Sequence, residues 1–231
     1  MNKLILNFKS KDSKKIKNPK NFLGGKGANL SEMGRMGLPV PPGFTISTKV
    51  CEIFYKDKKK LNSKLVNQIK KELKIIEKDV SKKFGDLKNP LLLSVRSGAR
   101  VSMPGMMDTI LNLGLNDKTV IALTNKTSNG RFAKDSYRRF IQMYSNVVMG
   151  VEGYHFEELI ENYKLTKGVL LDTDLDETDW DGLIKDFKNT VKEKTNKDFP
   201  QDVYEQLFGA ISAVFLSWES NRAKVYRKLN Q

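Results

Sequence analysis

A glycine-rich turn with one lysine, Gly24-Gly25-Lys26-Gly27, is the first segment of the sequence that could bind an anion. It lies just before a predicted helix, and a helix N-terminus exposes unpaired N–H groups and carries a partial positive charge. Glycines let the backbone approach a phosphate closely, and Lys26 adds a mobile full charge. The spacing of a Walker A motif is absent, so a plain glycine turn before a helix is an equally good interpretation of this segment alone.

Arg96 ends an apolar segment, LLLSVRS, that is predicted to form a central β-strand. By the two-residue period of a strand, Arg96 shares a face with Leu92 and Ser94. A buried arginine needs a partner, because an unpaired buried charge is costly. That partner is either an acidic side chain in a structural ion pair or the oxygens of a phosphate held by the guanidinium fork. Arg100, four residues further on, could add a second charge.

The loop GARVSMPGMMDT follows this strand and combines Gly98 and Gly105 with a proline and three methionines, among them Met107. Glycines give hinge freedom and expose backbone N–H groups. Methionines supply an adaptable apolar cover. This composition suits a lid that closes over phosphates and excludes water, and the alternative is a loop that plugs the core.

The elements that must position these segments are mixed in the first third of the chain and almost wholly helical after Asp117. The predicted strands are 4–8, 44–48 and 91–97. The predicted helices are 27–36, 49–56, 63–84, 118–126, 131–149, 155–163 and 200–229, and a further helix holds the apolar residues Trp180, Ile184, Phe187 and Val191. Gly85 is predicted to end the helix at 63–84, and Phe132 is predicted to be buried by the helix at 131–149. Thr48 and Asp117 are predicted N-caps. The last helix is apolar enough to return and pack on the first part of the chain.

The composition allows one large domain or two small ones, since 39% of the 231 residues are hydrophobic. No apolar run approaches the roughly 20 residues that span a bilayer, and the N-terminus lacks the order of a secretory signal, so we expect a cytoplasmic protein without a membrane partner. The lone Cys51 is predicted to be a buried structural thiol. The net charge of +14 favours anionic partners. Its lysines are dispersed and not interleaved with aromatics, so nucleic acid is not the expected partner.

Two longer segments, FLGGKGANLSEMGRMGLPVPPGFTISTKVC and LLLSVRSGARVSMPGMMDTILNLGLND, resemble the N-terminal signatures of the pyruvate, phosphate dikinase family in their order and spacing. A third, FAKDSYRRFIQMYSNVVMGV, extends the resemblance over nearly the whole chain. The resemblance implies an α+β or α/β fold, helix-rich overall, with an ATP-grasp-like first subdomain. That subdomain would comprise 1–116 together with 199–231, and 117–198 would be a large helical insertion.

The same resemblance implies which residues meet ATP. In that family the lysine of GGKGA and the arginine of SVRSGA contact ATP phosphates, and these are Lys26 and Arg96 here. The glycine-rich loop that closes on the phosphates corresponds to residues 98–109, with Gly105 as its flexible point. The expected ATP-binding residues are therefore Lys26, Arg96, Gly98, Arg100, Gly105, Met107, Asp108 and Thr109.

The family's reaction converts ATP, phosphate and pyruvate into AMP, pyrophosphate and phosphoenolpyruvate through a phosphohistidine on a swivelling domain. The resemblance implies that this chain supplies ATP phosphate-binding residues. The Mg²⁺ ligands, the phosphohistidine domain and the pyruvate barrel are expected beyond residue 231. The single histidine, His155, lacks the threonine-histidine context of the phosphorylated site and is expected to be a surface or satisfied histidine. We therefore expect weak or undetectable ATP affinity and no dikinase activity from this chain alone. The alternative is a non-catalytic interaction or regulatory module that keeps the fold.

Overall fold

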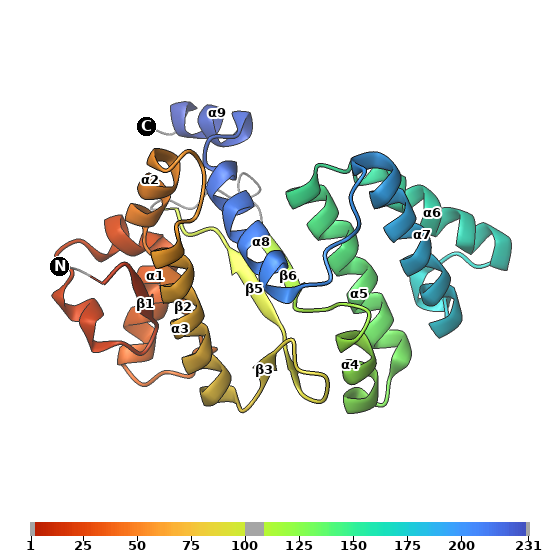
Figure 1. Ribbon diagram of the computed structural model, residues 1–231, viewed down its shortest axis with the longest axis horizontal. Coiled ribbons are helices and arrows are strands. Elements are labelled where there is room, and N and C mark those ends of the chain that lie inside the picture. The colour runs from red at the N-terminus through yellow and green to blue at the C-terminus, as the bar shows by residue number, and fades with distance from the viewer. Residues whose placement is uncertain (1–2, 100–108, 230–231) are drawn as a thin grey trace. The chain divides into compact units, whose positions relative to one another are not determined.

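The computed structural model describes residues 3–99 and 109–229 (Figure 1). Helices dominate these residues, and their strands form only two-stranded ladders, so the predicted helix-rich α+β character is confirmed. The chain divides into two compact units. One comprises Met1–Ser81, Arg96–Asp108 and Val214–Gln231, and the other comprises Lys82–Val95 and Thr109–Ala213. These units are defined by which residues contact one another, whereas the predicted subdomains follow the family resemblance. The predicted division into 1–116 with 199–231 and 117–198 therefore stays a prediction.

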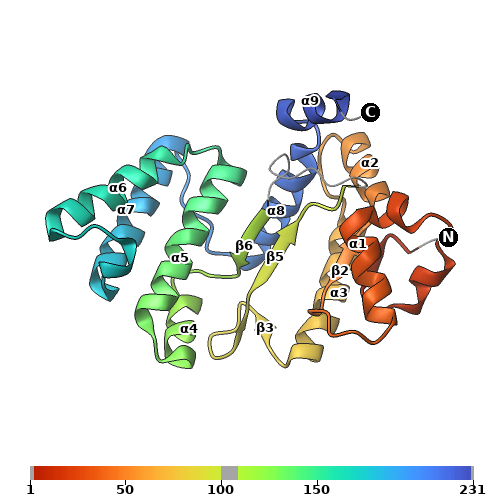
Figure 2. The same cartoon turned by 180° about the vertical axis from the view of Figure 1, so that it is seen from behind.

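The first unit is built on an antiparallel ladder of β1 (Ile5–Asn7) and β2 (Phe44–Ile46). Helix α1 (Pro19–Arg35) contacts β2, and α3 (Ser63–Val80) contacts β1. The ladder lies beside both helices in Figures 1 and 2. The other elements of this unit are η1 (Lys11–Lys15), α2 (Thr48–Lys56) and α9 (Asn221–Leu229).

Helix α3 follows its apolar spacing, with Leu65, Ile69, Leu73 and Ile76 buried along one face. Its start is capped by Asn62, whose side-chain oxygen accepts from the Leu65 N–H at 3.0 Å. The helix ends at Val80 and not at Phe84 as predicted. Ser81 takes the left-handed conformation, with φ 52°, and closes the helix before Gly85 is reached.

The second unit is a helical layer on short strands. Helix α5 (Gly130–Tyr144) contacts α4 (Thr119–Thr127), β6 (Thr109–Leu113) and α7 (Glu177–Thr195), while α6 (Tyr154–Lys167) contacts α7 (Figure 1). Strand β5 (Leu93–Arg96), whose last residue belongs to the first unit, pairs with β6, and β3 (Lys83–Phe84) pairs with β4 (Pro90–Leu91) in parallel. The remaining elements are η2 (Ser145–Met149), η3 (Asp172–Asp174) and α8 (Val203–Ser217), whose residues from Val214 on belong to the first unit.

A buried arginine joins α5 to α7 in the core of the second unit. Arg138 is 4% exposed, and its guanidinium lies 4.5 Å from the ring centroid of Trp180. Its Nε donates to Asp135 at 2.8 Å, and Nη2 donates to Asp172 at 3.1 Å. The predicted apolar face of α7 is confirmed, since its members are all buried: Trp180, Ile184, Phe187 and Val191. Phe132, also predicted to be buried, is instead 50% exposed.

The predicted central strand at 91–97 is wrong. Leu92 separates β4 from β5, and the two strands belong to different two-stranded ladders among the described residues. The sequence LLLSVRS is equally compatible with a buried central strand and with short strands at the edge of a ladder. Periodicity alone does not show how many neighbouring strands a strand has.

Two predicted helix caps are wrong by one residue. Ser47, not Thr48, is the N-cap residue of α2. Before α4, the Asn116 side-chain oxygen accepts from the N–H groups of Lys118 and Thr119 at 2.9 and 2.8 Å. Asp117 instead accepts from the hydroxyl of Tyr137 at 2.9 Å. Neighbouring residues of cap type compete for the position, and tertiary partners decide between them.

The predicted helix at 200–229 is divided into α8 and α9 by a turn at residues 218–220. Its predicted return to the first part of the chain is confirmed in the first unit. There the ring of Phe215 lies 5.2 Å from that of Phe54, and its carbonyl accepts from the Tyr55 hydroxyl at 2.9 Å. Within residues 3–99 and 109–229, no helix has the length and apolar character needed to cross a membrane.

Candidate functional site

The predicted anion-binding turn is a break inside α1. Gly24 has φ 72° and ψ 169°, which interrupts the helix between residues 19–23 and the part that begins at Gly25. This region of backbone space is essentially restricted to glycine, because a Cβ atom would collide with the chain. The predicted helix at 27–36 is therefore the second part of a longer, kinked element.

The break places the glycine turn against the end of β5. The Gly25 N–H donates to the carbonyl of Ala99 at 2.9 Å. A Cβ atom added to Gly24 would lie 1.4 Å from the carbonyl oxygen of Gly98. Among the described residues, a Cβ on Gly98 would meet the Leu23 carbonyl oxygen alone, at an ordinary 3.5 Å. The two segments singled out in the sequence thus meet through their backbones within the first unit.

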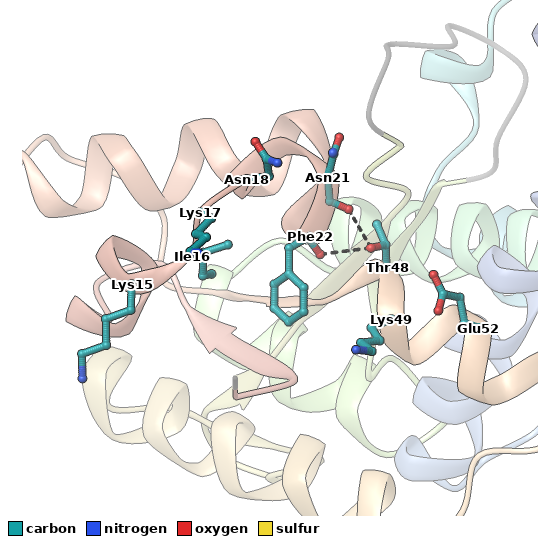
Figure 3. A pocket seen from close by; sticks show the side chains of 9 residues that line it. All are labelled: Lys15, Ile16, Lys17, Asn18, Asn21, Phe22, Thr48, Lys49 and Glu52. Atoms are coloured by element: carbon teal, nitrogen blue, oxygen red, sulfur yellow. Dashed lines mark hydrogen bonds between the residues drawn. The ribbon is translucent and has the colours of Figure 1, made fainter. Parts of the chain in front are cut away.

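A threonine side chain completes the break from the other side. The hydroxyl of Thr48 donates to the carbonyls of Asn21 at 2.8 Å and Phe22 at 3.3 Å (Figure 3). In an uninterrupted helix the Asn21 carbonyl would accept from the N–H of Gly25. Because Gly25 donates to Ala99 instead, the Thr48 hydroxyl supplies the missing donor, and insertion of a side chain into the hydrogen-bond ladder is a recognised cause of kinks.

The neighbouring residues of the turn have different roles. Gly27 is buried against β2, where an added Cβ would lie 2.7 Å from the Thr45 hydroxyl oxygen. Lys26 is exposed, and within the described part of the chain its ammonium group has no ion pair or hydrogen-bond partner. The helix is therefore packed through its glycines while the lysine side chain remains available to solvent.

Arg96 is exposed, not buried as the apolar strand suggested. The two-residue alternation is confirmed, because Ser94 shares its exposure while Leu93 and Val95 are half-buried. Burial therefore gives no reason for Arg96 to require an internal ion pair, and its position at the strand end directly precedes the contact between Ala99 and Gly25.

The other predicted ATP-binding residues are only partly described. Arg100, Gly105, Met107 and Asp108 lie outside the described residues. Thr109 is half-buried at the start of β6 and belongs to the second unit. The structure therefore brings together the segments that carry Lys26, Arg96 and Gly98, and the roles of all eight residues stay predictions.

A hollow of about 570 Å³ adjoins the Thr48 contact (Figure 3). Its lining combines three lysines, one glutamate, two asparagines and the ring of Phe22 with Ile16 and Thr48. The lining residues are Lys15, Ile16, Lys17, Asn18, Asn21, Phe22, Thr48, Lys49 and Glu52. None of its lysines was singled out in the sequence, because single lysines are common throughout this chain.

Among the described residues, ionisable groups elsewhere in the chain form no second candidate site. Within 3–99 and 109–229, no three histidine, cysteine, aspartate or glutamate side chains lie close enough to hold a metal ion. Burial, followed by the charges of Glu219 and Glu52, raises the pKa of the half-buried Cys51 thiol to about 11. Its neutral state fits the predicted structural role. His155 is half-buried near the start of α6, with its ring 4.0 Å from that of Tyr154.

Comparison with known proteins gives the family of this chain. The family profile described as "Pyruvate phosphate dikinase, AMP/ATP-binding domain" matches residues 20–71 and 58–231. The pyruvate, phosphate dikinase of Clostridium symbiosum is 53% identical over 212 residues, which are 91% of this chain and 24% of that protein. The chloroplastic enzyme of Flaveria pringlei is 51% identical over 229 residues, 99% of this chain and 24% of that protein. That of Entamoeba histolytica is 50% identical over 209 residues, 90% of this chain and 24% of that protein.

The chain therefore spans about a quarter of the length of these curated relatives. The profile match covers most of the chain, and both sequence segments that meet at Gly25 and Ala99 lie within it. By these matches the chain belongs to the pyruvate, phosphate dikinase family.

Proposed function

We propose that this chain binds the phosphate groups of ATP where the glycine turn of α1 meets the end of β5. The hydrogen bond from the Gly25 N–H to the Ala99 carbonyl supports the proposal most directly, because it holds the segments of Lys26 and Arg96 next to one another. The description of the matching family as an AMP/ATP-binding domain supports an adenine nucleotide as the ligand.

In this proposal Lys26 and Arg96 supply the positive charges. Lysine acts as a point charge on phosphate oxygens, and arginine can bind two oxygens at once. Residues 98–109 would close over the phosphates, with Gly98, Arg100, Gly105, Met107, Asp108 and Thr109 at the nucleotide. The scaffold would be the first part of an ATP-grasp-like domain, comprising 1–116 with 199–231, and 117–198 would be its helical insertion.

The reaction we propose for the whole enzyme is the dikinase reaction, in which ATP, phosphate and pyruvate give AMP, pyrophosphate and phosphoenolpyruvate. Phosphoryl transfer requires positioned phosphates, a metal and a nucleophile. This chain would contribute the first of these, in the cytoplasm. Because the described residues hold no cluster of carboxylates suited to Mg²⁺, no step through the metal is assigned to them. The phosphohistidine and pyruvate domains would be partners of this chain in the complete enzyme, so we propose that the chain alone is inactive.

Nuclear magnetic resonance of the ¹⁵N-labelled chain tests the nucleotide proposal, because shift changes detect millimolar affinities. Titration with ATP should move the amide signals of Gly25, Lys26, Gly27 and Ser97. Pyrophosphate should move the same signals, while adenosine, which lacks phosphates, should leave them in place.

Two results would contradict this proposal. One is an ATP response confined to the second unit. The other is an adenosine response equal to that of ATP at the glycine turn, which would mean that phosphates are not what the turn recognises. Release of AMP and pyrophosphate from ATP, phosphate and pyruvate by the isolated chain would separately overturn the proposed inactivity.

A further inference from the structure

We infer that Thr48 is a positioning residue for the phosphate-binding turn, an inference that rests on the proposed function. Its hydroxyl, not its backbone, is the group that acts. It donates to the carbonyls of Asn21 and Phe22, which directly precede the break at Gly24 (Figure 3). Thr48 would therefore act on the nucleotide through the shape of the turn.

The Gly25 N–H can donate to either of two carbonyls, depending on whether the helix is broken at Gly24. In a regular helix it would bond to the carbonyl of Asn21, four residues earlier, and the turn would be lost. In the observed state it bonds to Ala99 at 2.9 Å. Asn21 is exposed, so without Thr48 its carbonyl would accept either from water or from the Gly25 N–H of a regular helix. The Thr48 hydroxyl, 2.8 Å from that carbonyl, supplies a fixed protein donor that favours the broken geometry.

The backbone that carries Thr48 is held in place by its neighbours. It is the first residue of α2, and the Ser47 N–H immediately before it donates to the carbonyl of Leu4, next to β1, at 3.0 Å. Helix α2 is anchored through Val50 and Phe54, each 0% exposed. A β-branched side chain in a helix also has few rotamers. The hydroxyl position is thus set by the sheet and the core and not by the turn it holds.

Three hydrogen bonds therefore act in sequence: Ser47 is bonded to Leu4, the adjacent Thr48 is bonded to the turn, and Gly25 of the turn is bonded to Ala99. Lys26 is the next residue after Gly25 and is exposed. Loss of the Thr48 hydroxyl should therefore change where the Lys26 backbone lies relative to the end of β5, without removing any charge that could touch a phosphate.

The test compares Thr48→Val, which keeps the side-chain size and removes the donor, with Thr48→Ser, which keeps the donor. Thr166→Val is the matched control, because the Thr166 hydroxyl also donates to a helix carbonyl, that of Asn162 at 2.8 Å, but in α6. The first measurement needs no nucleotide. It is the through-bond scalar coupling between the Gly25 amide nitrogen and the Ala99 carbonyl carbon in labelled protein.

We expect this coupling to fall by at least about half in Thr48→Val, and to be retained in Thr48→Ser and Thr166→Val. The second measurement is the ATP titration, in which Thr48→Val should bind about 3- to 10-fold more weakly, the range expected for one lost hydrogen bond. Thr48→Ser should bind like the wild type. If Thr48→Val gives no dispersed spectrum, Thr48→Ala removes the same donor without adding an apolar group.

An unchanged Gly25–Ala99 coupling in Thr48→Val and Thr48→Ala would overturn the inference. A lost coupling with unchanged ATP affinity would also overturn it, since the hydroxyl would then serve stability alone. Absence of any ATP response in the wild type would overturn the proposed nucleotide function. The coupling measured without nucleotide would still decide whether Thr48 holds the turn.

Discussion

The carbonyl oxygen of Gly98 occupies the space where a side chain on Gly24 would begin, 1.4 Å from the position of an added Cβ atom. The two glycines belong to segments far apart in the sequence. Gly24 is therefore required by the other segment's backbone as well as by its own torsion angles. This contact and the adjacent hydrogen bond from Gly25 to Ala99 join the two sequence segments at one place in the structure.

Replacement of Gly24 by alanine should destabilise the first unit strongly. The φ of 72° with ψ of 169° costs a non-glycine residue about 1–3 kcal/mol, and relief of the clash with Gly98 adds to this. We expect the free energy of unfolding to fall by about 3 kcal/mol or more. Gly37→Ala is the matched control, because Gly37 has φ 77° but an added Cβ would have no atom of residues 3–99 or 109–229 within 4 Å. Its cost should be about 1–2 kcal/mol. Urea denaturation measures both, and equal losses would contradict the clash.

Replacement of Lys26 by glutamine should weaken nucleotide binding without changing stability. Lys26 is exposed and has no partner among the described residues, so its removal breaks no internal contact. A hydrogen bond to a charged group is worth about 1.5–3 kcal/mol, which corresponds to a loss in ATP affinity of about tenfold or more. Lys20→Gln, an exposed lysine of the same helix, is the control and should bind ATP as the wild type does. The amide titration reports affinity, and a thermal melt reports stability. Equal weakening by the two changes would indicate general electrostatics.

Replacement of Arg138 by methionine should destabilise the second unit. The side chain is 5% exposed, bonds to Asp135 and Asp172, and lies over Trp180. Removing one partner of a buried ion pair typically costs about 3–5 kcal/mol. We expect less here, about 2–3 kcal/mol, because Arg139 still pairs with Asp135 and Lys164 still pairs with Asp172. The adjacent Arg139 also bonds to Asp135 but is 59% exposed, so Arg139→Met should cost at most about 1 kcal/mol. Chemical denaturation followed by tryptophan fluorescence compares them, and similar losses would refute the importance of burial.

Cys51 should react slowly with alkylating reagents in the folded protein. Burial raises its pKa to about 11, so at pH 8 the reactive thiolate should be on the order of 100-fold scarcer than in the unfolded chain. Alkylation by iodoacetamide, followed by mass spectrometry with and without urea, measures the ratio. A folded chain that reacts as fast as the unfolded one at pH 8 would be incompatible with this pKa.

The raised pKa of Cys51 also fixes the sign of its effect on stability. The folded state favours the protonated thiol, so this contribution is complete below the ordinary value of 9.0 and is lost as the pH rises toward about 11. Tyrosines titrate in the same range, so Cys51→Ala is the reference. The difference in melting temperature between wild type and variant should shrink from pH 8.5 to pH 11. A difference that grows over this range would mean that the sign is wrong.

Long amphipathic helices could be predicted from the sequence because burial follows their apolar period. The buried face of α7, with Trp180, Phe187 and Val191, is one example, and the return of Phe215 to Phe54 is another. Helix ends were less predictable, as Ser81 in place of Gly85 and Ser47 in place of Thr48 show. The choice among neighbouring polar residues depends on partners that local sequence does not specify.

The candidate site was predictable as two segments but not as a contact. The residue types at Gly24 and Lys26 suggested an anion at a helix start, whereas the structure uses the Gly25 N–H for Ala99. The exposure of Arg96 and the role of the Thr48 hydroxyl were missed. Both depend on which distant segment lies beside each residue, and a pattern with a period of two or 3.6 carries no such information.

The glycine torsion at position 24 also changes how a saturation mutagenesis screen of this family should be interpreted. Intolerance at Gly24 would reflect selection on the shape of the unliganded chain, because every L-amino acid meets the Gly98 carbonyl before any ligand arrives. Intolerance at Lys26, two residues later, would have no such structural origin. In such a screen, fitness losses at position 24 would report the amount of folded protein, and losses at position 26 would report ligand recognition. Position 24 therefore serves as an internal reference for protein yield.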